Sequence, residues 1–260
     1  MKNILSLLLL AGISLSACTE IIQIELNDSE PRYVMEANLS AENQRMELRI
    51  ALSGSFTDAG TYDVVSNATV TLSDDEGRNW ALLETSPGQY TRDSIHTQAG
   101  MMYQVKVLIG GESFFATSVM PEAVLVDSVA FQYISNPNIG TGWSPIIYYQ
   151  SLSGEAPSLQ VHISGPSGGP QRSFLSFDNV TTESQSRILQ ASYPKGMQLQ
   201  LRIDALDRSA YDYLQSVAEL VGEGIGPTSA APTNPDPMWT GGALGYFSAH
   251  TSSEISVVVE

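Results

Sequence analysis

Apolar and polar side chains alternate over short stretches along most of this chain. At 46–52, Met, Leu, Ile and Leu occupy every second position, separated by Glu, Arg and Ala, and the same alternation recurs at 103–109 and 198–203. A period of two buries one face of a β-strand and leaves the other in water. Because clusters of Gly, Pro and Asp follow these stretches, the pattern predicts a mainly β protein with antiparallel sheets.

The predicted strands fall into two regions. Region 32–121 holds about seven short strands, with turns expected at 74–77, 86–88 and 110–111, which is typical of an immunoglobulin- or transthyretin-like β-sandwich. Met120-Pro121-Glu122 resembles a domain boundary. We therefore expect a second, β-rich domain over 122–260.

One short helix is predicted at about 209–221 in the second domain. Ser209, followed three residues later by Asp212, resembles a capping box, and apolar residues recur at helical spacing as far as Gly222. Stretches rich in Gly, Asn and Pro predict loops at 135–145 and 222–242. The last apolar residues, 255–259, could close a sheet.

The start of the chain has the pattern of a bacterial lipoprotein signal peptide. A basic start and an apolar stretch at 4–13, too short to span a bilayer, precede the lipobox Leu15-Ser16-Ala17-Cys18. We expect 1–17 to be a signal peptide and 18–31 an acidic tether lipidated at Cys18. The alternative is a plain signal peptide with an incidental cysteine.

Acylation of Cys18 would hold the protein at a membrane, since each buried methylene contributes ~0.8 kcal/mol and two chains suffice for stable anchoring. Cys18 is the only cysteine, so the chain can form no intramolecular disulfide. The 12 basic and 28 acidic residues give a net charge of −16, which argues against nucleic acid as a partner. Solubility explains this charge better than recognition of a cationic ligand.

No convincing catalytic or metal-binding set is evident, and no cofactor is predicted. Ser167 lies in a Gly-x-Ser-x-Gly sequence at 165–169, but strands are expected on both sides, whereas a nucleophile elbow needs a strand and then a helix. A hydrolase using Ser167 is therefore the least favoured hypothesis. The three histidines, His96, His162 and His250, form no paired ligand motif, although they could still converge in space.

Two further sets of residues each have two possible interpretations. The acidic stretch 74–77 could bind calcium, but it lacks the ligand spacing of an EF-hand and is better explained as a hairpin turn. Trp143, Tyr148 and Trp239 adjoin the predicted loops. They are candidate contacts for a ligand or partner if exposed, and core residues if buried.

Several motifs together resemble the Bacteroidetes-type lipoprotein family built on domain of unknown function 4249. The motifs, in chain order, are the lipobox, Pro31-Arg32-Tyr33-Val34-Met35-Glu36-Ala37, the segment 67–77, Pro87-Gly88-Gln89-Tyr90, the segment 100–105, Met120-Pro121, Tyr211-Asp212-Tyr213-Leu214, Asn234-Pro235 and the segment 241–247. The resemblance spans nearly the whole mature chain. Segment 164–177 departs from the family's expected acidic turn and tyrosine-rich strand.

The resemblance implies an accessory lipoprotein without established activity, anchored in the outer membrane on either its periplasmic or its outer face. It also implies a TonB-dependent transporter as the partner. We therefore expect a non-catalytic binding protein that assists nutrient uptake. The alternative is a surface adhesion or structural lipoprotein that binds no small ligand.

Overall fold

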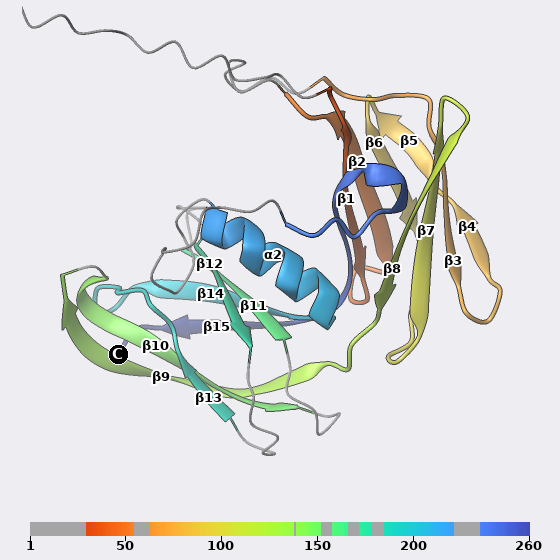
Figure 1. Ribbon diagram of the computed structural model, residues 1–260. Coiled ribbons are helices and arrows are strands. Elements are labelled where there is room, and N and C mark those ends of the chain that lie inside the picture. Colours follow the sequence, from red (N-terminus) through yellow and green to blue (C-terminus); the bar gives the residue numbers. More distant parts are fainter. Residues whose placement is uncertain are drawn as a thin grey trace, which may run out of the picture. The chain divides into compact units, whose positions relative to one another are not determined.

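Three β-sheets and one α-helix make up the described part of the unit that runs from Pro31 to Glu260 (Figure 1). The mainly β prediction is therefore confirmed. The computed structural model describes residues 30–54, 63–137, 139–151, 158–165, 172–177, 185–220 and 235–260.

The largest sheet has eight strands drawn from both ends of the chain. In order of neighbours they are β12 (Arg172–Phe177), β11 (Ser158–Ser164), β14 (Gln198–Leu206), β15 (Leu244–Val258), β1 (Tyr33–Ser40), β2 (Arg45–Leu52), β6 (Gln89–Asp93) and β5 (Leu83–Ser86). The pairing of β1 with β15 is parallel, and the other described pairs are antiparallel.

Two smaller sheets and two helical segments complete the described structure. They are the four-stranded sheet of β4 (Asn79–Ala81), β3 (Thr69–Asp74), β7 (Met102–Ile109) and β8 (Glu112–Val119); the three-stranded sheet of β13 (Gln185–Ile188), β10 (Gly140–Ser151) and β9 (Val124–Asn136); the α-helix α2 (Arg208–Leu220); and the short 3-10 helix η1 (Thr240–Gly242).

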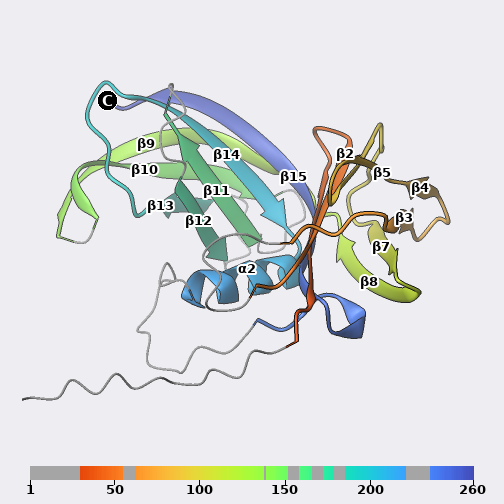
Figure 2. The ribbon, with the colours of Figure 1, turned by 90° about the horizontal axis from the view of Figure 1, so that it is seen from above.

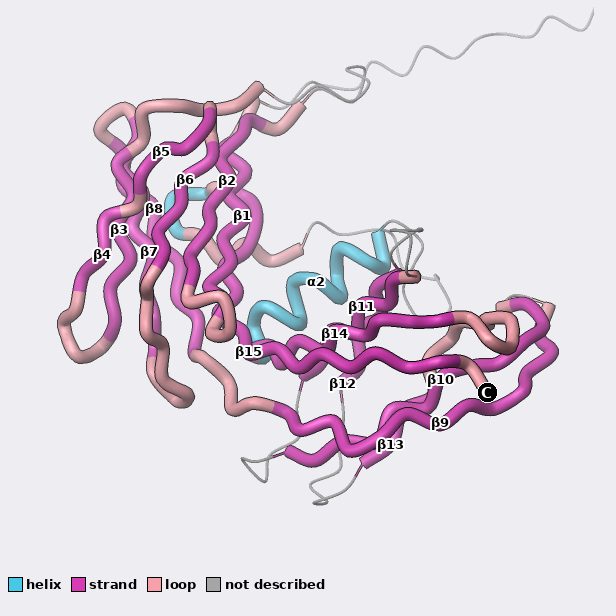
Figure 3. The backbone as a smooth tube through the Cα atoms, turned by 180° about the vertical axis from the view of Figure 1, so that it is seen from behind, coloured by secondary structure: helices cyan, strands magenta, loops and turns pink. Residues whose placement is uncertain are grey.

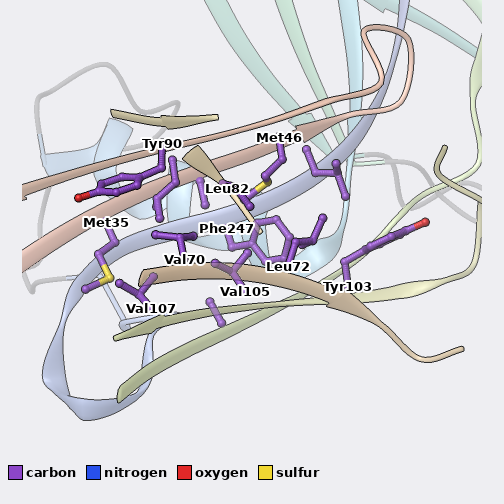
Figure 4. Close-up of a cluster of buried hydrophobic side chains, with 14 of the residues drawn as sticks. Met35, Met46, Val70, Leu72, Leu82, Tyr90, Tyr103, Val105, Val107 and Phe247 are labelled. Carbon is purple, nitrogen blue, oxygen red and sulfur yellow. The ribbon is translucent and has the colours of Figure 1, made fainter. Parts of the chain in front are cut away.

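Each smaller sheet shares a hydrophobic core with part of the large one. The first core joins β1, β2 and β6 to β3, β7 and β8, and Figure 4 shows its centre around Phe247, Leu72 and Val105. The second core joins β11 and β14 to β9 and β10. In most of these strands alternate residues point into the cores, which is the period of two seen in the sequence.

Strand β15 takes part in both cores. Its first half pairs with β1 and places Phe247 and Ala249 in the first core, and its second half pairs with β14 and packs Ile255 and Val257 against the second (Figure 3). Within β15, the sequence indicated a strand only at 255–259. The first core thus includes residues from the end of the chain, while the domain boundary at 121/122 stays a prediction.

The predicted loop at 135–145 is wrong, because β9 and β10 form a hairpin through most of it. Pro145 lies inside β10 opposite Phe131, although it has no N–H to donate. The amide of Leu189 donates to the Pro145 carbonyl (2.9 Å), and the buried Ser144 hydroxyl donates to the Leu189 carbonyl in place of the missing N–H. The backbone hydrogen bonding is thereby completed around the proline.

Helix α2 is confirmed almost at its predicted bounds, but its cap is not at Ser209. The carboxylate of Asp207 accepts a hydrogen bond from the amide of Ala210 (2.8 Å), so Asp207 is the N-cap. Asp212 instead pairs with Arg208 on the surface (2.8 Å). Asp207 also accepts hydrogen bonds from the hydroxyl of Ser118 and the amide of Val119 (3.3 Å), which ties the helix to the end of β8.

Replacing Asp207 with Ala is expected to lower the free energy of unfolding by about 2 kcal/mol, because the cap and the link to Ser118 are lost together. Urea denaturation measures the change. The matched control is Asp212→Ala, which removes an exposed ion pair and should cost less than about 0.5 kcal/mol. Equal losses in the two variants would contradict the role of Asp207.

Candidate functional site

The large sheet carries polar side chains on the face that points away from the two cores. On β14 the residues that alternate with the core positions include Arg202 and Asp204, on β15 they include Ser248 and His250, and on β1 they include Asn38. Helix α2 contacts β11, β12 and β15 and lies on the side of the sheet opposite β9 and β10 (Figure 2). A polar surface is thereby enclosed between strands and helix.

A cavity of about 370 Å³ opens on this face where β11, β14, β15, β1 and β2 come together. Most of its lining residues are polar, and Leu214 is contributed by helix α2. The lining residues are Asn38, Ser40, Asn43, Arg45, Glu47, Gln160, His162, Arg202, Asp204, Leu206, Leu214, Tyr246, Ser248 and His250. We refer to it below as the junction cavity.

Asp204 is the most buried charged group of the junction cavity, with 4% of its side chain exposed. Its Oδ2 accepts a hydrogen bond from Arg202 Nη2 (3.0 Å) and lies 3.1 Å from Nε2 of His162. Burial by itself raises the pKa of the Asp204 carboxyl, but hydrogen bonds with His162 and Ser252 and the charge of Arg202 outweigh it and leave the pKa below its ordinary value. Asp204 is therefore a carboxylate near neutral pH.

Two buried oxygen atoms of the junction cavity have no hydrogen-bond partner among the residues that the structure describes, and the buried Nε of Arg202 has none there either. The two oxygens are Oδ1 of Asp204 and Oγ of Ser248, whose residue is 2% exposed. Buried polar groups in native proteins are nearly always hydrogen-bonded, and leaving one unpaired costs about 1–3 kcal/mol. A ligand that satisfies both atoms would remove that cost.

The wall formed by β1 and β2 is also polar, but its groups are already paired. Arg45 contacts Glu47 (2.6 Å) and Asp93 (2.7 Å), and the amide of Asn38 donates to the hydroxyl of Tyr246 (3.2 Å). The arginines of the junction cavity thus have carboxylate partners, and no strong net charge of either sign remains.

The junction cavity also brings together His162 and His250, which lie far apart in the sequence. In the described part of the chain, no three His, Cys, Asp or Glu side chains are grouped closely enough to hold a metal ion. The arrangement can donate and accept several hydrogen bonds at once. The polar residues that alternate with Leu201 and Ile203 were the only sequence signal of this face, and nothing indicated which strands would meet there.

Burial lowers the pKa of His250, and the nearby carboxylate of Asp204 offsets only part of this effect. The unfolded chain therefore takes up a proton on this imidazole at a higher pH than the folded protein does. Stability should fall as the pH drops from about 6.5 through the lowered pKa of the folded state. The pKa of Asp204 is also lowered, but its protonation reduces stability only below about pH 4.

The free energy of unfolding of the unchanged protein is accordingly expected to fall between about pH 7.5 and about pH 5.5, and that of His250→Gln should fall less. Urea unfolding at both pH values measures the two changes. His96 is exposed, so His96→Gln serves as the control and should retain the original pH dependence. An identical pH dependence in His250→Gln and the unchanged protein would contradict the assignment of His250 as a buried neutral imidazole.

The three aromatic candidates have different surroundings. Trp239 belongs to the first core, and its indole N–H donates to the carbonyl of Met35 (2.9 Å), so of its two alternatives the structure has the buried one. Trp143 is half-buried against the second core, with its ring edge-to-face with Tyr133 at 5.5 Å. Tyr148 is 40% exposed. Of these candidates only Tyr148 presents a largely open surface to a partner.

Other sequence candidates lie outside the junction cavity. Cys18 and Ser167 are outside the described residues, although β11 and β12, which flank Ser167, pair as an antiparallel hairpin. The carboxylate of Asp74 accepts hydrogen bonds from the backbone and side chain of Arg78, so it stabilises the hairpin turn. No helix in the described ranges is long and apolar enough to span a membrane.

Solved structures with some similarity include fibronectin type-III domains and a cytokine receptor complex. A segment of two fibronectin type-III domains from chicken tenascin has 11% identity, covering 67% of this chain and 90% of its own, with a TM-score of 0.24. A cytokine receptor complex has 9% identity, covering 86% and 95%, with a TM-score of 0.28. Similarity at this level says nothing about ligand or partner.

The comparison of sequences is more informative. No curated protein matches the chain. The family model described as "Domain of unknown function (DUF4249)" matches residues 19–256. The match begins directly after Cys18 and includes every residue that lines the junction cavity. Because the family model spans nearly the whole chain, this protein belongs to the DUF4249 family.

Proposed function

We propose that this protein is a non-enzymatic, outer-membrane-anchored lipoprotein that binds a small polar ligand and assists a TonB-dependent transporter in nutrient uptake. The observation that carries the binding role is the junction cavity, in which buried atoms of Asp204 and Ser248 lack partners. Binding sites for small molecules usually have volumes of about 300–1,000 Å³ and contain a few polar groups that converge on the ligand.

The anchor rests on the lipobox that ends at Cys18. Cys18→Ser is expected to abolish incorporation of radiolabelled palmitate and to move most of the protein from the membrane fraction to the soluble fraction, because no acyl chain can then be attached. Ser16→Thr, a small change before the cleavage point, is the control and should remain acylated. Labelling of the Cys18→Ser variant would contradict the assignment.

The transporter partnership is supported by the resemblance to accessory lipoproteins and by the proposed anchor, which would concentrate the protein beside barrel proteins of the same membrane. Affinity purification of the lipidated protein in mild detergent is expected to recover a TonB-dependent barrel protein. The control is the same purification with an unrelated lipoprotein. Recovery of no barrel, together with loss of cell attachment in a deletion strain, would favour the adhesion hypothesis instead.

A further inference from the structure

We propose that the ligand of the junction cavity is a neutral polyhydroxylated molecule of about monosaccharide size, a sugar or a related polyol. This inference rests on the proposed binding role and names the ligand class. It follows from three properties of the cavity, which are its charge balance, the kind of hydrogen bonds that its unpaired atoms require, and its size.

The charge balance argues against an ionic ligand. Arg202 donates to Asp204 (3.0 Å), and Arg45 contacts Glu47 (2.6 Å) and Asp93 (2.7 Å). An anionic ligand would have to displace one of these carboxylates, and a cationic ligand would have to displace an arginine. Asp204 is buried, so displacing Arg202 from it would leave an uncompensated buried charge, which is costly, whereas the exposed pairs of Arg45 cost less to break. A neutral ligand avoids this loss.

The unpaired atoms require a ligand that both donates and accepts hydrogen bonds. Oδ1 of the Asp204 carboxylate can only accept, so the ligand must bring a donor to it. Oγ of Ser248 can do either. Gln160 and Asn43 add amide groups to the lining. Neighbouring hydroxyl groups on one ring supply a donor and an acceptor at each carbon, which matches this mixture.

The size and the apolar part of the lining fit a compact ring. A volume of about 370 Å³ lies near the lower end of ordinary small-molecule sites, so it suits one sugar ring better than a long chain. Tyr246 and Leu214 contribute carbon surface to an otherwise polar cavity. Aromatic and aliphatic side chains pack against the C–H face of a sugar while its hydroxyls reach the polar groups.

The test is titration calorimetry on the folded mature chain. Its ligands are a panel of common neutral monosaccharides and the polyol myo-inositol, compared with glutamate, citrate and lysine at the same concentrations. At least one neutral polyol is expected to bind, and the three charged compounds are not. Binding of a charged compound alone, or of no compound, would overturn the proposal while leaving the recovery of a transporter as a separate result.

Two variants locate the binding. Ser248→Ala removes the unpaired hydroxyl and is expected to weaken the affinity about threefold to tenfold, the value of one hydrogen bond. Asp204→Asn retains the size of the side chain but replaces one acceptor oxygen with a donor, and it should weaken binding at least as much. Ser256→Ala is the matched control, because Ser256 is exposed on the same strand and does not line the junction cavity.

Urea unfolding of each variant distinguishes loss of binding from loss of structure. Ser248→Ala is expected to remain as stable as the unchanged protein or to become more stable, since it removes a buried group without a partner. If it folds and binds the polyol with unchanged affinity, the assignment of the ligand to the junction cavity is wrong.

Discussion

Gly245→Ala is expected to lower the free energy of unfolding by more than about 4 kcal/mol, which would leave much of the protein unfolded because native proteins have only about 5–15 kcal/mol in total. A Cβ atom at Gly245 would lie 2.0 Å from the carbonyl oxygen of Met35 and 2.7 Å from its carbonyl carbon, so the clash is with backbone. The positive φ of 101° adds strain for any other residue. Strand β15 is held in place there by its parallel pairing with β1 over 244–250 and by Phe247, which is buried in the first core.

The matched control is Gly242→Ala. Gly242 also has a positive φ, of 78°, but a Cβ there would meet nothing within 4 Å. The free energy of unfolding of this variant should therefore fall only by the cost of the backbone conformation, about 1–2 kcal/mol. Denaturation midpoints measured for both proteins separate the clash from the backbone strain. If Gly242→Ala is destabilised as much as Gly245→Ala, close approach to Met35 is not the cause.

A fragment of residues 31–121 is expected not to fold on its own, although it contains the whole predicted first sandwich. In the complete chain, Phe247 is fully buried in the first core and Trp239 is 3% exposed there. Removing a buried Phe or Trp side chain costs about 3–5 kcal/mol each. The edge of β1 that pairs with β15 would also be open. These losses together are comparable to the whole stability of an ordinary domain, about 5–15 kcal/mol.

The dispersion of amide signals in a proton–nitrogen NMR spectrum checks the fragment. The spectrum of 31–121 alone should be narrow, and addition of a synthetic peptide covering 238–251 should increase its dispersion by restoring the missing strand. A peptide of the same composition in scrambled order is the control. A well-dispersed spectrum of the fragment alone would mean that the first core is stable without β15.

The turns and most strands of the first region could be predicted, because their signals are local. The Asp74 turn is formed by residues within five positions of one another, and β7 shows a clean alternation of buried and exposed residues. The continuation of β9 and β10 through 135–145 was missed, since Gly and Pro usually interrupt strands. Pro145 is tolerated there because Ser144 completes the hydrogen bonding of Leu189, a residue far along the chain.

The candidate site illustrates the same limit. His162 looked like an isolated polar residue in a predicted strand, Asp204 and His250 lay outside the stretches predicted as strands at 198–203 and 255–259, and no spacing connected the three. Their meeting depends on β14 lying between β11 and β15. Trp239 shows the reverse case: its position in a Gly- and Pro-rich segment suggested a surface residue as readily as a core residue, and its bond to Met35 places it inside.

The sequence by itself determined the mainly β class, the faces of most strands and the expectation of a lipid anchor at Cys18. Alternation with a period of two and a lipobox are local signals, because each is complete within a few neighbouring residues. Only the tertiary structure decided that β15 pairs with β1 and joins both cores, and that the polar faces of five strands enclose one cavity. Alternation states which side chains share a face of a strand. It does not state which strands become neighbours, because that choice depends on contacts between residues about 200 positions apart, such as Met35 and Gly245.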